Sequence, residues 1–375
     1  MDNIQMVDLK SQYQKIKTEV DKGIQQVIDT TSFVKGKVVK DFEDNLAIYL
    51  NTKHVISCGN GTDALQVAMM ALGLKPGDEV ITTSFTFIAT AEVIALLGLT
   101  PVLVDCDPNT YNITPEAIRG AITDKTKAIV PVHVFGQSAP MEAIMDIAKE
   151  YNLAVIEDNA QAIGADYIMN DGSKRKTGTI GDLGCTSFFP SKNLGAFGDG
   201  GAVFTDNDEL AEKLRAIVNH GMKVRYYHDY VGVNSRLDGI QAAILDVKLR
   251  HLDEYAAARN YAASYYDNAF ANHKHITTPA RYEKSNHVFH QYTMKLKDAD
   301  RDALKEHLNT KGVPMMVYYP VPLHLQKAYK DDRYSEGDFP VTECLSNSVF
   351  SLPMHTEMND EQLKYITDSV LEFFK

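Results

Sequence analysis

The chain has few cysteines, and their positions argue against a zinc site. Only four cysteines occur among 375 residues, at positions 58, 106, 185 and 344, and no two of them form a C-x-x-C pair. Structural zinc sites usually take their thiolate ligands from such closely spaced pairs. Three of the four lie in apolar runs, where cysteine behaves as a small buried hydrophobe. This usage is typical of a reducing compartment, so we expect a cytoplasmic protein.

Long apolar runs and basic clusters are also missing. No run approaches the length of a membrane span, and the first ten residues carry charge without the apolar segment of a signal peptide, so we expect no membrane partner. The 38 Lys and Arg residues face 50 Asp and Glu residues, which gives a net charge of −12. Binding to nucleic acid needs clustered basic residues, so we expect no nucleic-acid partner. An anionic small molecule remains open, because a local site can oppose the global charge.

Short apolar runs alternate with amphipathic segments over the first two thirds of the chain. We expect strands at residues 54–58, 80–82, 100–104, 128–134 and 201–205. We expect helices at residues 13–30, 39–50, 64–72, 88–97, 115–122, 141–151, 209–219 and 239–252, with an extended piece at 4–9. Strands that alternate with helices indicate βαβ units and a mainly parallel sheet.

The pattern changes near residue 249. There we expect helices through 265–271, at 301–309 and at 362–374, strands at 288–296 and 313–319, and a loop at 330–339. These segments do not form regular βαβ units. We therefore predict a large α/β domain at residues 1–248 and a smaller α+β domain at residues 249–375.

One lysine lies just after an apolar run. Residues 184–191 are typical of a buried strand and its loop, and Lys192 follows with a glycine-rich turn after it. An amine in low-dielectric surroundings has a lowered pKa, and a neutral amine can form a Schiff base with an aldehyde. From this stretch alone, an ordinary solvated lysine is the simpler interpretation.

A second stretch changes that balance. Residues 153–161 form a hydrophobic strand that ends in Glu157 and Asp158, with Gln161 after it. Ligands of open α/β sheets bind at the carboxyl ends of strands. Pyridoxal phosphate requires a Schiff-base lysine and an acid that keeps a proton on the pyridine nitrogen. Asp158 alone would more often be an ion-pair partner or a helix cap, but together with Lys192 we favour the cofactor.

Five short motifs lie in order along the chain, at residues 60–65, 157–161, 187–195, 198–201 and 233–238. Together they resemble the nucleotide-sugar aminotransferases of the DegT/DnrJ/EryC1/StrS family, and the match covers nearly the whole chain. The resemblance implies a fold-type-I pyridoxal-phosphate transferase, with a mainly parallel α/β large domain and a smaller α+β C-terminal domain. It also implies pyridoxal 5'-phosphate as cofactor, glutamate as amino donor and a homodimer with shared active sites.

The resemblance assigns the cofactor phosphate to Gly61, Thr62 and Ser187. The first two open an expected helix, whose free N–H groups attract a phosphate. From the residues alone, Thr62 or Asp63 could equally be an ordinary helix cap. Asn234 of the neighbouring subunit would also contact the phosphate.

The resemblance places Phe87 on the pyridine ring and Gln161 near the ring hydroxyl. One of Phe85 and Phe87 is expected to be core, and we choose Phe87 for the ring. The same comparison makes Lys192 the Schiff-base lysine and proton carrier, and Asp158 the partner of the ring nitrogen.

Substrate contacts are expected from several other segments. Residues 220–230 are aromatic and basic, so Arg225 and His228 either grip a phosphate or sugar acid or belong to an ordered surface loop. The resemblance adds Arg236, near the substrate of the neighbouring subunit. We also expect Tyr318 and Tyr319, in a turn-rich segment, to line the cleft between domains. His133 either contacts substrate or is a satisfied core histidine, and the residues alone leave both open.

The resemblance implies transfer of an amino group to C3 of a nucleotide-linked keto-sugar for surface polysaccharides such as lipopolysaccharide. Lys192 stands where dehydrating relatives have histidine, which favours aminotransfer. We expect UDP-2-acetamido-2-deoxy-3-oxo-glucuronate as the acceptor. However, Tyr318 replaces the histidine that such enzymes often have there, so a dTDP-linked 3-keto-6-deoxyhexose is the alternative.

Two other classes of function compete with the aminotransferase. A nicotinamide oxidoreductase would need a G-x-G-x-x-G motif after its first strand, and the sequence has none there. A non-catalytic sensor that binds pyridoxal phosphate would be supported by a DNA-binding domain, and no basic flank exists. Both therefore rank below the aminotransferase.

Overall fold

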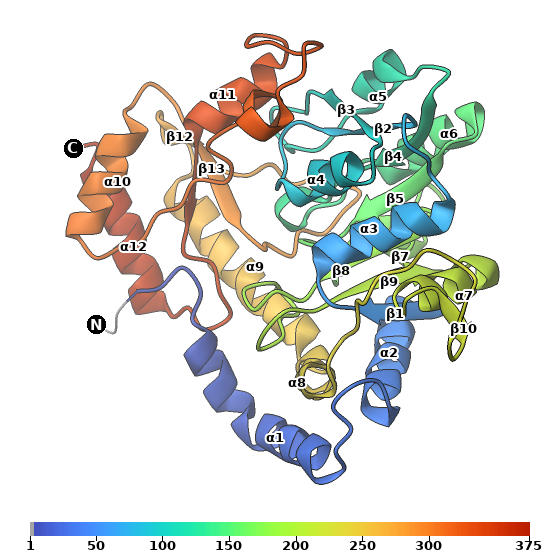
Figure 1. Cartoon of the computed structure of the whole chain (residues 1–375). Coiled ribbons are helices and arrows are strands. Elements are labelled where there is room, and N and C mark those ends of the chain that lie inside the picture. Colours follow the sequence, from blue (N-terminus) through green and yellow to red (C-terminus); the bar gives the residue numbers. More distant parts are fainter. Residues whose placement is uncertain (1–3) are drawn as a thin grey trace.

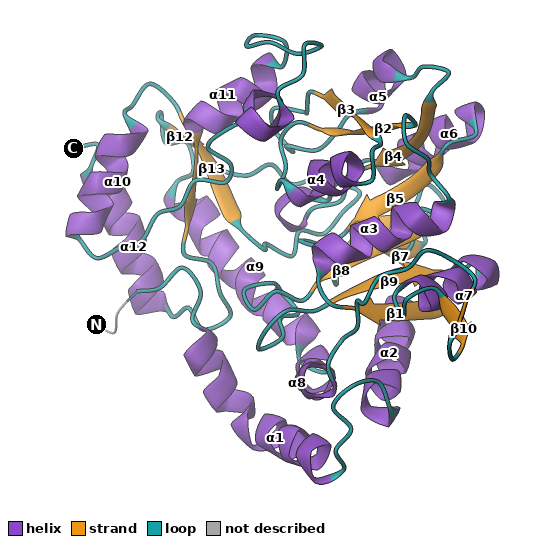
Figure 2. Ribbon diagram, viewed as in Figure 1, coloured by secondary structure: helices purple, strands orange, loops and turns teal. Residues whose placement is uncertain are grey.

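A seven-stranded sheet forms the centre of the computed structural model, which describes residues 4–375 (Figures 1 and 2). Its strand order is β1-β9-β8-β5-β4-β2-β3. The strands are β1 His54–Cys58, β2 Glu79–Thr83, β3 Thr100–Val104, β4 Thr126–Val130, β5 Ala154–Asp158, β8 Leu183–Ser187 and β9 Gly201–Thr205. Neighbours β3, β2, β4, β5 and β8 are parallel, and only β9 runs against them. The expected mainly parallel α/β fold is therefore confirmed.

Helices cover both faces of this sheet. They are α2 Lys37–Leu50, α3 Gly61–Leu72, α4 Ala89–Leu96, α5 Pro115–Ala121, α6 Met141–Tyr151, α7 Asp208–Ile217 and α8 Gly239–Leu249. In β4, Ala128 and Val130 pack with α3, α4 and α7, whereas Ile129 packs with α5 and α6. This alternation follows from the period of two along a strand, and it explains why both faces of the strand are apolar.

The N-terminal helix α1, Leu9–Asp29, packs against α8 at the bottom of the view in Figure 1. Residues 4–8 are neither helix nor strand, and the extended piece expected at 4–9 is wrong only at Leu9, where α1 begins. Asp8 instead caps α1, because its carboxylate accepts from the N–H of Ser11 at 2.9 Å. Across residues 4–375, no helix is both long and apolar enough to cross a membrane.

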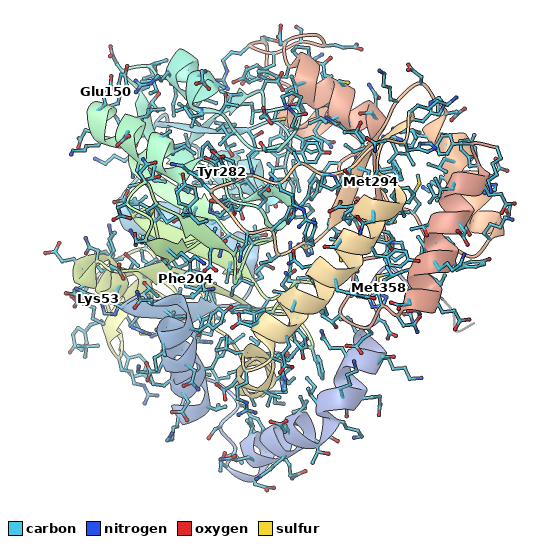
Figure 3. All side chains as sticks on the ribbon, turned by 180° about the vertical axis from the view of Figure 1, so that it is seen from behind. Lys53, Glu150, Phe204, Tyr282, Met294 and Met358 are labelled. Carbon is cyan, nitrogen blue, oxygen red and sulfur yellow. The ribbon has the colours of Figure 1, made fainter. Side chains whose placement is uncertain are left out.

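The last third of the chain has its own core. Its elements are α9 Leu252–Ala269, β12 Ile276–Thr277, β13 Tyr292–Leu296, α10 Arg301–Thr310, α11 Pro340–Ser348, β14 Val349–Leu352 and α12 Asp360–Glu372. The three strands form an antiparallel sheet in the order β12-β13-β14. Met294 and Met358 belong to this core, whereas Phe204 lies in the core of the large sheet (Figure 3).

One expected strand in this region is wrong, and one expected helix ends earlier than predicted. Residues 313–319 form no strand, and only a single bridge joins Met316 to Ser351 of β14. Pro314 lies within that segment and Pro320 follows it, and proline has no N–H to donate to a sheet. The helix expected at 239–252 is confirmed as α8, which ends at Leu249, and α9 begins at Leu252 after the chain turns at Arg250 and His251.

Gly184 in β8 tests how tightly the central sheet is packed. A Cβ at Gly184 would overlap the carbonyl oxygen of Gly178, so we expect Gly184→Ala to lower the free energy of unfolding by about 3 kcal/mol or more. Gly120, near the end of α5, has nothing within 4 Å of an added Cβ, so Gly120→Ala is the matched control. The control should raise stability by about 0.5 kcal/mol, because alanine favours a helix. Denaturant titration of both variants checks this, and equal stabilities would contradict the packing.

Candidate functional site

The sheet brings distant segments to one edge. The parallel strands β5 and β8 end at Asp158 and Ser187, and the antiparallel β9 begins at the same edge with Gly201. The helix α3 also starts there, after β1. Ligands bind at such an edge because loops and helix N-termini gather outside the sheet.

Asp158 is a buried carboxylate with no ion pair in the part of the chain that the structure describes. Its side chain accepts from the hydroxyl of Thr90 at 2.7 Å and from the N–H of Ala160 at 3.2 Å. Asp158 is 6% exposed. Neither sequence alternative, ion-pair partner or helix cap, describes it. A buried anion is costly without a cation, so this geometry suits a ligand that presents a positive group.

Lys192 lies in the loop after β8 and is half-buried. Its amine has no hydrogen-bond acceptor among residues 4–375. Loss of hydration lowers the pKa of Lys192 to about 8, and the charge of Asp158 opposes this shift. A lysine with such a pKa is substantially neutral near pH 8 and can act as a nucleophile.

A tight cradle lies where α3 begins. Asn60 caps the helix, since its side chain accepts from the N–H of Asp63 at 2.8 Å. The expectation that Thr62 or Asp63 would be the cap is wrong, because the helix begins at Gly61, earlier than its apolar pattern indicates. A Cβ on Gly61 would lie 2.6 Å from the Cβ of Ser187, so only glycine allows this approach.

Phe87 and Tyr319 form an aromatic group at the same edge. Phe87 is 55% exposed, while Phe85 is 1% exposed and packs in the core, so the two rings divide as expected. The ring centroids of Phe87 and Tyr319 are 6.2 Å apart. The amide of Gln161 donates to the Tyr319 hydroxyl at 2.9 Å and accepts from the N–H of Phe135 at 2.8 Å. The side chain of Gln161 is thus fixed by two hydrogen bonds, and Tyr318, next to Tyr319 in the chain, is half-buried.

Arg225 and His228 lie elsewhere in the chain, on an exposed hairpin formed by β10 Met222–Val224 and β11 Tyr227–His228. The hairpin stands beside α7 (Figure 1). The guanidinium of Arg225 stacks over the ring of Tyr226, and His228 bonds to the carbonyl of His220 at 2.8 Å. No described contact joins either residue to Lys192 or Asp158.

The segment that carries Asn234 and Arg236 is anchored next to the cradle. The hydroxyl of Ser235, between them, accepts from the N–H of Gly59 at 2.9 Å and donates to Asp63 at 2.6 Å. Asn234 itself is exposed. Arg236 is half-buried, and its guanidinium lies 3.4 Å from the side-chain oxygen of Asn219.

His133 is a satisfied core histidine. Its ring bonds to Glu157 at 2.8 Å and accepts from the N–H of Ala139 at 3.1 Å, and the residue is fully buried. The interpretation as a substrate contact is therefore wrong. Burial raises the pKa of Glu157, but His133 and backbone N–H groups outweigh burial, so the pKa of Glu157 is lowered.

Sequence reasoning missed Thr90, Asn60 and Ser235. Thr90 is 68 positions from Asp158 and lies inside an apolar helix, where threonine usually signals nothing. Asn60 was detectable, because asparagine before a helix is a frequent cap. Ser235 had no local signal, since its partners are more than 170 positions away.

Comparisons with known proteins agree with this geometry. The profile of the DegT/DnrJ/EryC1/StrS aminotransferase family matches residues 14–371. A "Pleiotropic regulatory protein" of Geobacillus stearothermophilus is 47% identical over 100% of this chain and 99% of its own length. A UDP-2-acetamido-2-deoxy-3-oxo-D-glucuronate aminotransferase of Pseudomonas aeruginosa is 46% identical over 97% of this chain and 98% of its own. The crystal structure of S. venezuelae DesV in complex with a ketimine intermediate has a TM-score of 0.95 and 37% identity, covering 100% of this chain and 99% of that one.

The lowered pKa of Lys192 can be tested in protein freed of small molecules. An amine-acylating reagent attacks only the neutral amine, so acylation of Lys192 should follow a titration with a midpoint near pH 8. In Asp158→Asn the midpoint should fall, because the carboxylate charge that raises this pKa is gone. Peptide mass spectrometry reads the modification site. A midpoint near the ordinary lysine pKa of about 10.4, or no shift in the variant, would contradict this environment.

Proposed function

Because the chain belongs to the DegT/DnrJ/EryC1/StrS aminotransferase family, we propose that it moves an amino group from glutamate to C3 of a UDP-linked 3-keto-sugar. The chain is an aminotransferase, and pyridoxal 5'-phosphate is the family's cofactor. The observation that carries the chemistry is the buried, unpaired Asp158 at the same sheet edge as Lys192, whose pKa is lowered.

The residues present fit this cofactor. Asp158 would hold a proton on the pyridine nitrogen, which would supply the cation that the buried carboxylate lacks. Gly61 and Thr62, at the start of α3, and Ser187 would hold the phosphate, and the exposed ring of Phe87 would cover the pyridine face. When bound, the cofactor supplies an electron sink for the carbon that loses its proton.

Lys192 would hold the cofactor and then carry protons. Its pKa of about 8 leaves a substantial neutral fraction near pH 8, so the amine can take up a proton and return it within one cycle. Gln161 would approach the ring hydroxyl, and its bond to Tyr319 fixes its direction.

The preferred acceptor is UDP-2-acetamido-2-deoxy-3-oxo-glucuronate. The 46% identity to the Pseudomonas enzyme of that name supports it over nearly the full length of both chains. Arg225 or Arg236 would pair with the uronate carboxylate, with His228, Tyr318 and Tyr319 as further contacts. A dTDP-linked 3-keto-6-deoxyhexose remains the alternative acceptor.

We propose a homodimer with shared active sites. Arg225 and His228 lie on an exposed hairpin without contact to Lys192 of their own chain, and Asn234 is exposed. Such residues could reach the site of a neighbouring subunit.

We also propose a cytoplasmic location, a role in the synthesis of lipopolysaccharide or another surface polysaccharide, and a division into domains at residues 1–248 and 249–375. The four unpaired cysteines support the location.

A second candidate is a regulator that binds the cofactor without turnover. The Geobacillus relative is named for regulation and is 47% identical. Turnover separates the two candidates, because a sensor without catalysis would not consume a keto-sugar.

Lys192→Ala tests the catalytic proposal. The wild-type protein loaded with pyridoxal phosphate should convert glutamate and the UDP-linked 3-keto-uronate to products, with a higher kcat/KM than for the dTDP-linked alternative. Lys192→Ala should lose at least about 10³-fold in kcat, because it removes the nucleophile and proton carrier. Chromatographic detection of the amino-sugar nucleotide measures both. Lys174→Ala, on an exposed hairpin, is the control and should keep full activity. Full activity in Lys192→Ala would end the proposal.

Mixed dimers test the shared site. We expect Lys192→Ala and Asn234→Ala dimers each to be weakly active or inactive, whereas subunits mixed after reversible dissociation should regain activity. One site in each mixed dimer would then have both Lys192 and Asn234 intact. Differently tagged subunits allow purification of the mixed dimer and assay of its turnover. No recovery in the purified mixed dimer would count against shared sites.

A further inference from the structure

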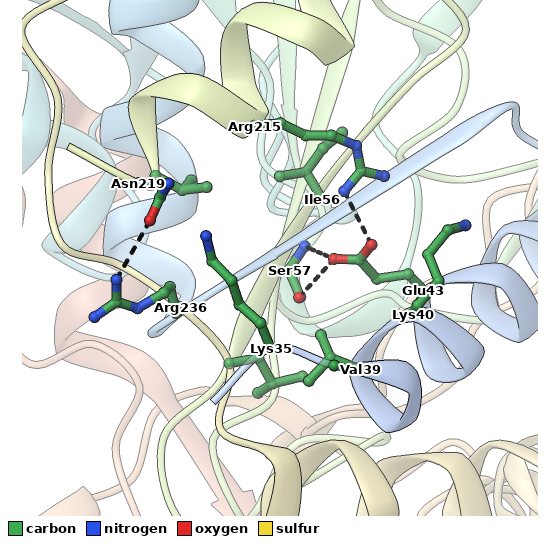
Figure 4. Close-up of a pocket in the computed structure, with 12 residues that line it drawn as sticks. Lys35, Val39, Lys40, Glu43, Ile56, Ser57, Arg215, Asn219 and Arg236 are labelled. Atoms are coloured by element: carbon green, nitrogen blue, oxygen red, sulfur yellow. Dashed lines mark hydrogen bonds and ion pairs between the residues drawn. The ribbon is translucent and has the colours of Figure 1, made fainter. Parts of the chain in front are cut away.

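A cavity of about 270 Å³ lies behind the cradle, between the start of α2, the end of α7 and the segment that carries Arg236 (Figure 4). It is lined by Lys35, Gly36, Lys40, Glu43, Arg215 and Arg236, among others. Ser57 of β1 forms part of its wall, two residues before Gly59, which Ser235 anchors. The cavity is therefore joined to the proposed site by a short stretch of backbone.

Most of the charges in this cavity are already paired. The carboxylate of Glu43 accepts from the N–H and hydroxyl of Ser57 at 2.9 and 2.7 Å, and it forms an ion pair with Arg215 at 3.0 Å. Lys40 is paired with Asp44. Glu43, the only acid among the residues that line the cavity, is thus already engaged by Ser57 and Arg215.

Lys35 and Arg236 remain without an acidic partner in the described part of the chain. The side chain of Lys35 extends into the cavity toward Asn219, and Arg236 approaches the same asparagine from the other side (Figure 4). Loss of hydration lowers the pKa of Lys35, and the charge of Arg236 lowers it further. Lys35 and Arg236 thus repel each other, although acidic residues outnumber basic ones in this chain of net charge −12. A cavity with two cations and no free acid is suited to an anionic ligand.

We propose that Lys35 and Arg236 together bind a phosphoryl group in this cavity. A phosphoryl group carries the charge that both cations lack, and arginine and lysine are its usual ligands. The hydrogen bond of Arg236 to Asn219 fixes the guanidinium beside a residue that also lines the cavity. This assignment directs Arg236 to phosphate and leaves Arg225 for the uronate carboxylate.

Two sources share this chemistry. One is the diphosphate of the nucleotide-linked sugar, which rests on the proposed function. The other is a separate phosphate compound that binds beside the site. Binding and inhibition distinguish them, because only the first competes with the keto-sugar.

Calorimetric titration with inorganic pyrophosphate tests the site directly. The protein is loaded with pyridoxal phosphate, so that the cradle at Gly61 is already filled. Wild type should bind pyrophosphate, and Lys35→Gln and Arg236→Gln should each weaken binding by about tenfold, the usual effect of losing one charge-assisted hydrogen bond. Lys37→Gln is the matched control, because Lys37 lies two residues from Lys35, is paired with Asp41 and does not line this cavity. It should change the affinity less than about twofold.

The outcomes are distinct. Pyrophosphate that competes with the keto-sugar identifies the substrate diphosphate as the ligand, and pyrophosphate that binds without competing identifies a separate phosphate compound. Either outcome supports the site, provided that the Lys35 and Arg236 variants lose affinity. Absence of binding to wild type, or variants that match Lys37→Gln, would overturn the proposal. The titration needs no turnover, so its result stands even if the proposed amino transfer fails.

Discussion

A buried negative charge at the end of β5 is the constraint on which the site depends. The side chain of Asp158 accepts from Thr90 and from the N–H of Ala160, and it forms no ion pair among the described residues. The carboxylate of its neighbour Glu157 has more partners, because it accepts from three backbone N–H groups and bonds to His133. The two adjacent carboxylates therefore differ in environment: Glu157 is satisfied within the core, whereas Asp158 has few partners, which is why we propose it as a ligand contact.

The same charge sets the state of Lys192. Desolvation lowers the pKa of the Lys192 amine to about 8. The negative charge of Asp158 partly offsets this effect, so the pKa is not lowered further. A lysine that lost more hydration without a nearby acid would be neutral but a poor proton acceptor. The balance of burial and charge thus gives a group that can both attack and shuttle protons near neutral pH.

Some basic side chains have no acidic partner among the described residues, although the chain as a whole is acidic. Arg225 is exposed on its hairpin, and Lys35 and Arg236 face one cavity without an acid to neutralise them. By contrast, Lys37 and Lys40 are each paired with an acid of their own helix. Local pairing thus neutralises these two lysines, whereas Lys35 and Arg236 have no acidic partner in the described part of the chain.

Much of the fold and part of the site were predictable from local sequence. Strands such as β1 and β9 and helix α6 have the expected bounds, because their apolar residues recur at the period of their own element. Lys192 and Asp158 were also recognisable, since each follows an apolar strand and together they suit one cofactor. The strand expected at 313–319 is wrong because its β-rich composition was given more weight than Pro314, and the segment forms only one bridge, from Met316 to Ser351.

The sequence by itself determined which residue types were available and roughly where each element lies. Tertiary structure alone decided their partners: Thr90 reached Asp158, Ser235 tied its segment to Gly59, and His133 became core. It also decided that Lys35 and Arg236, 201 positions apart, face one cavity. The physical reason is that local periodicity fixes an element, whereas a charge or hydrogen bond depends on which distant groups the packed sheet and helices bring within reach.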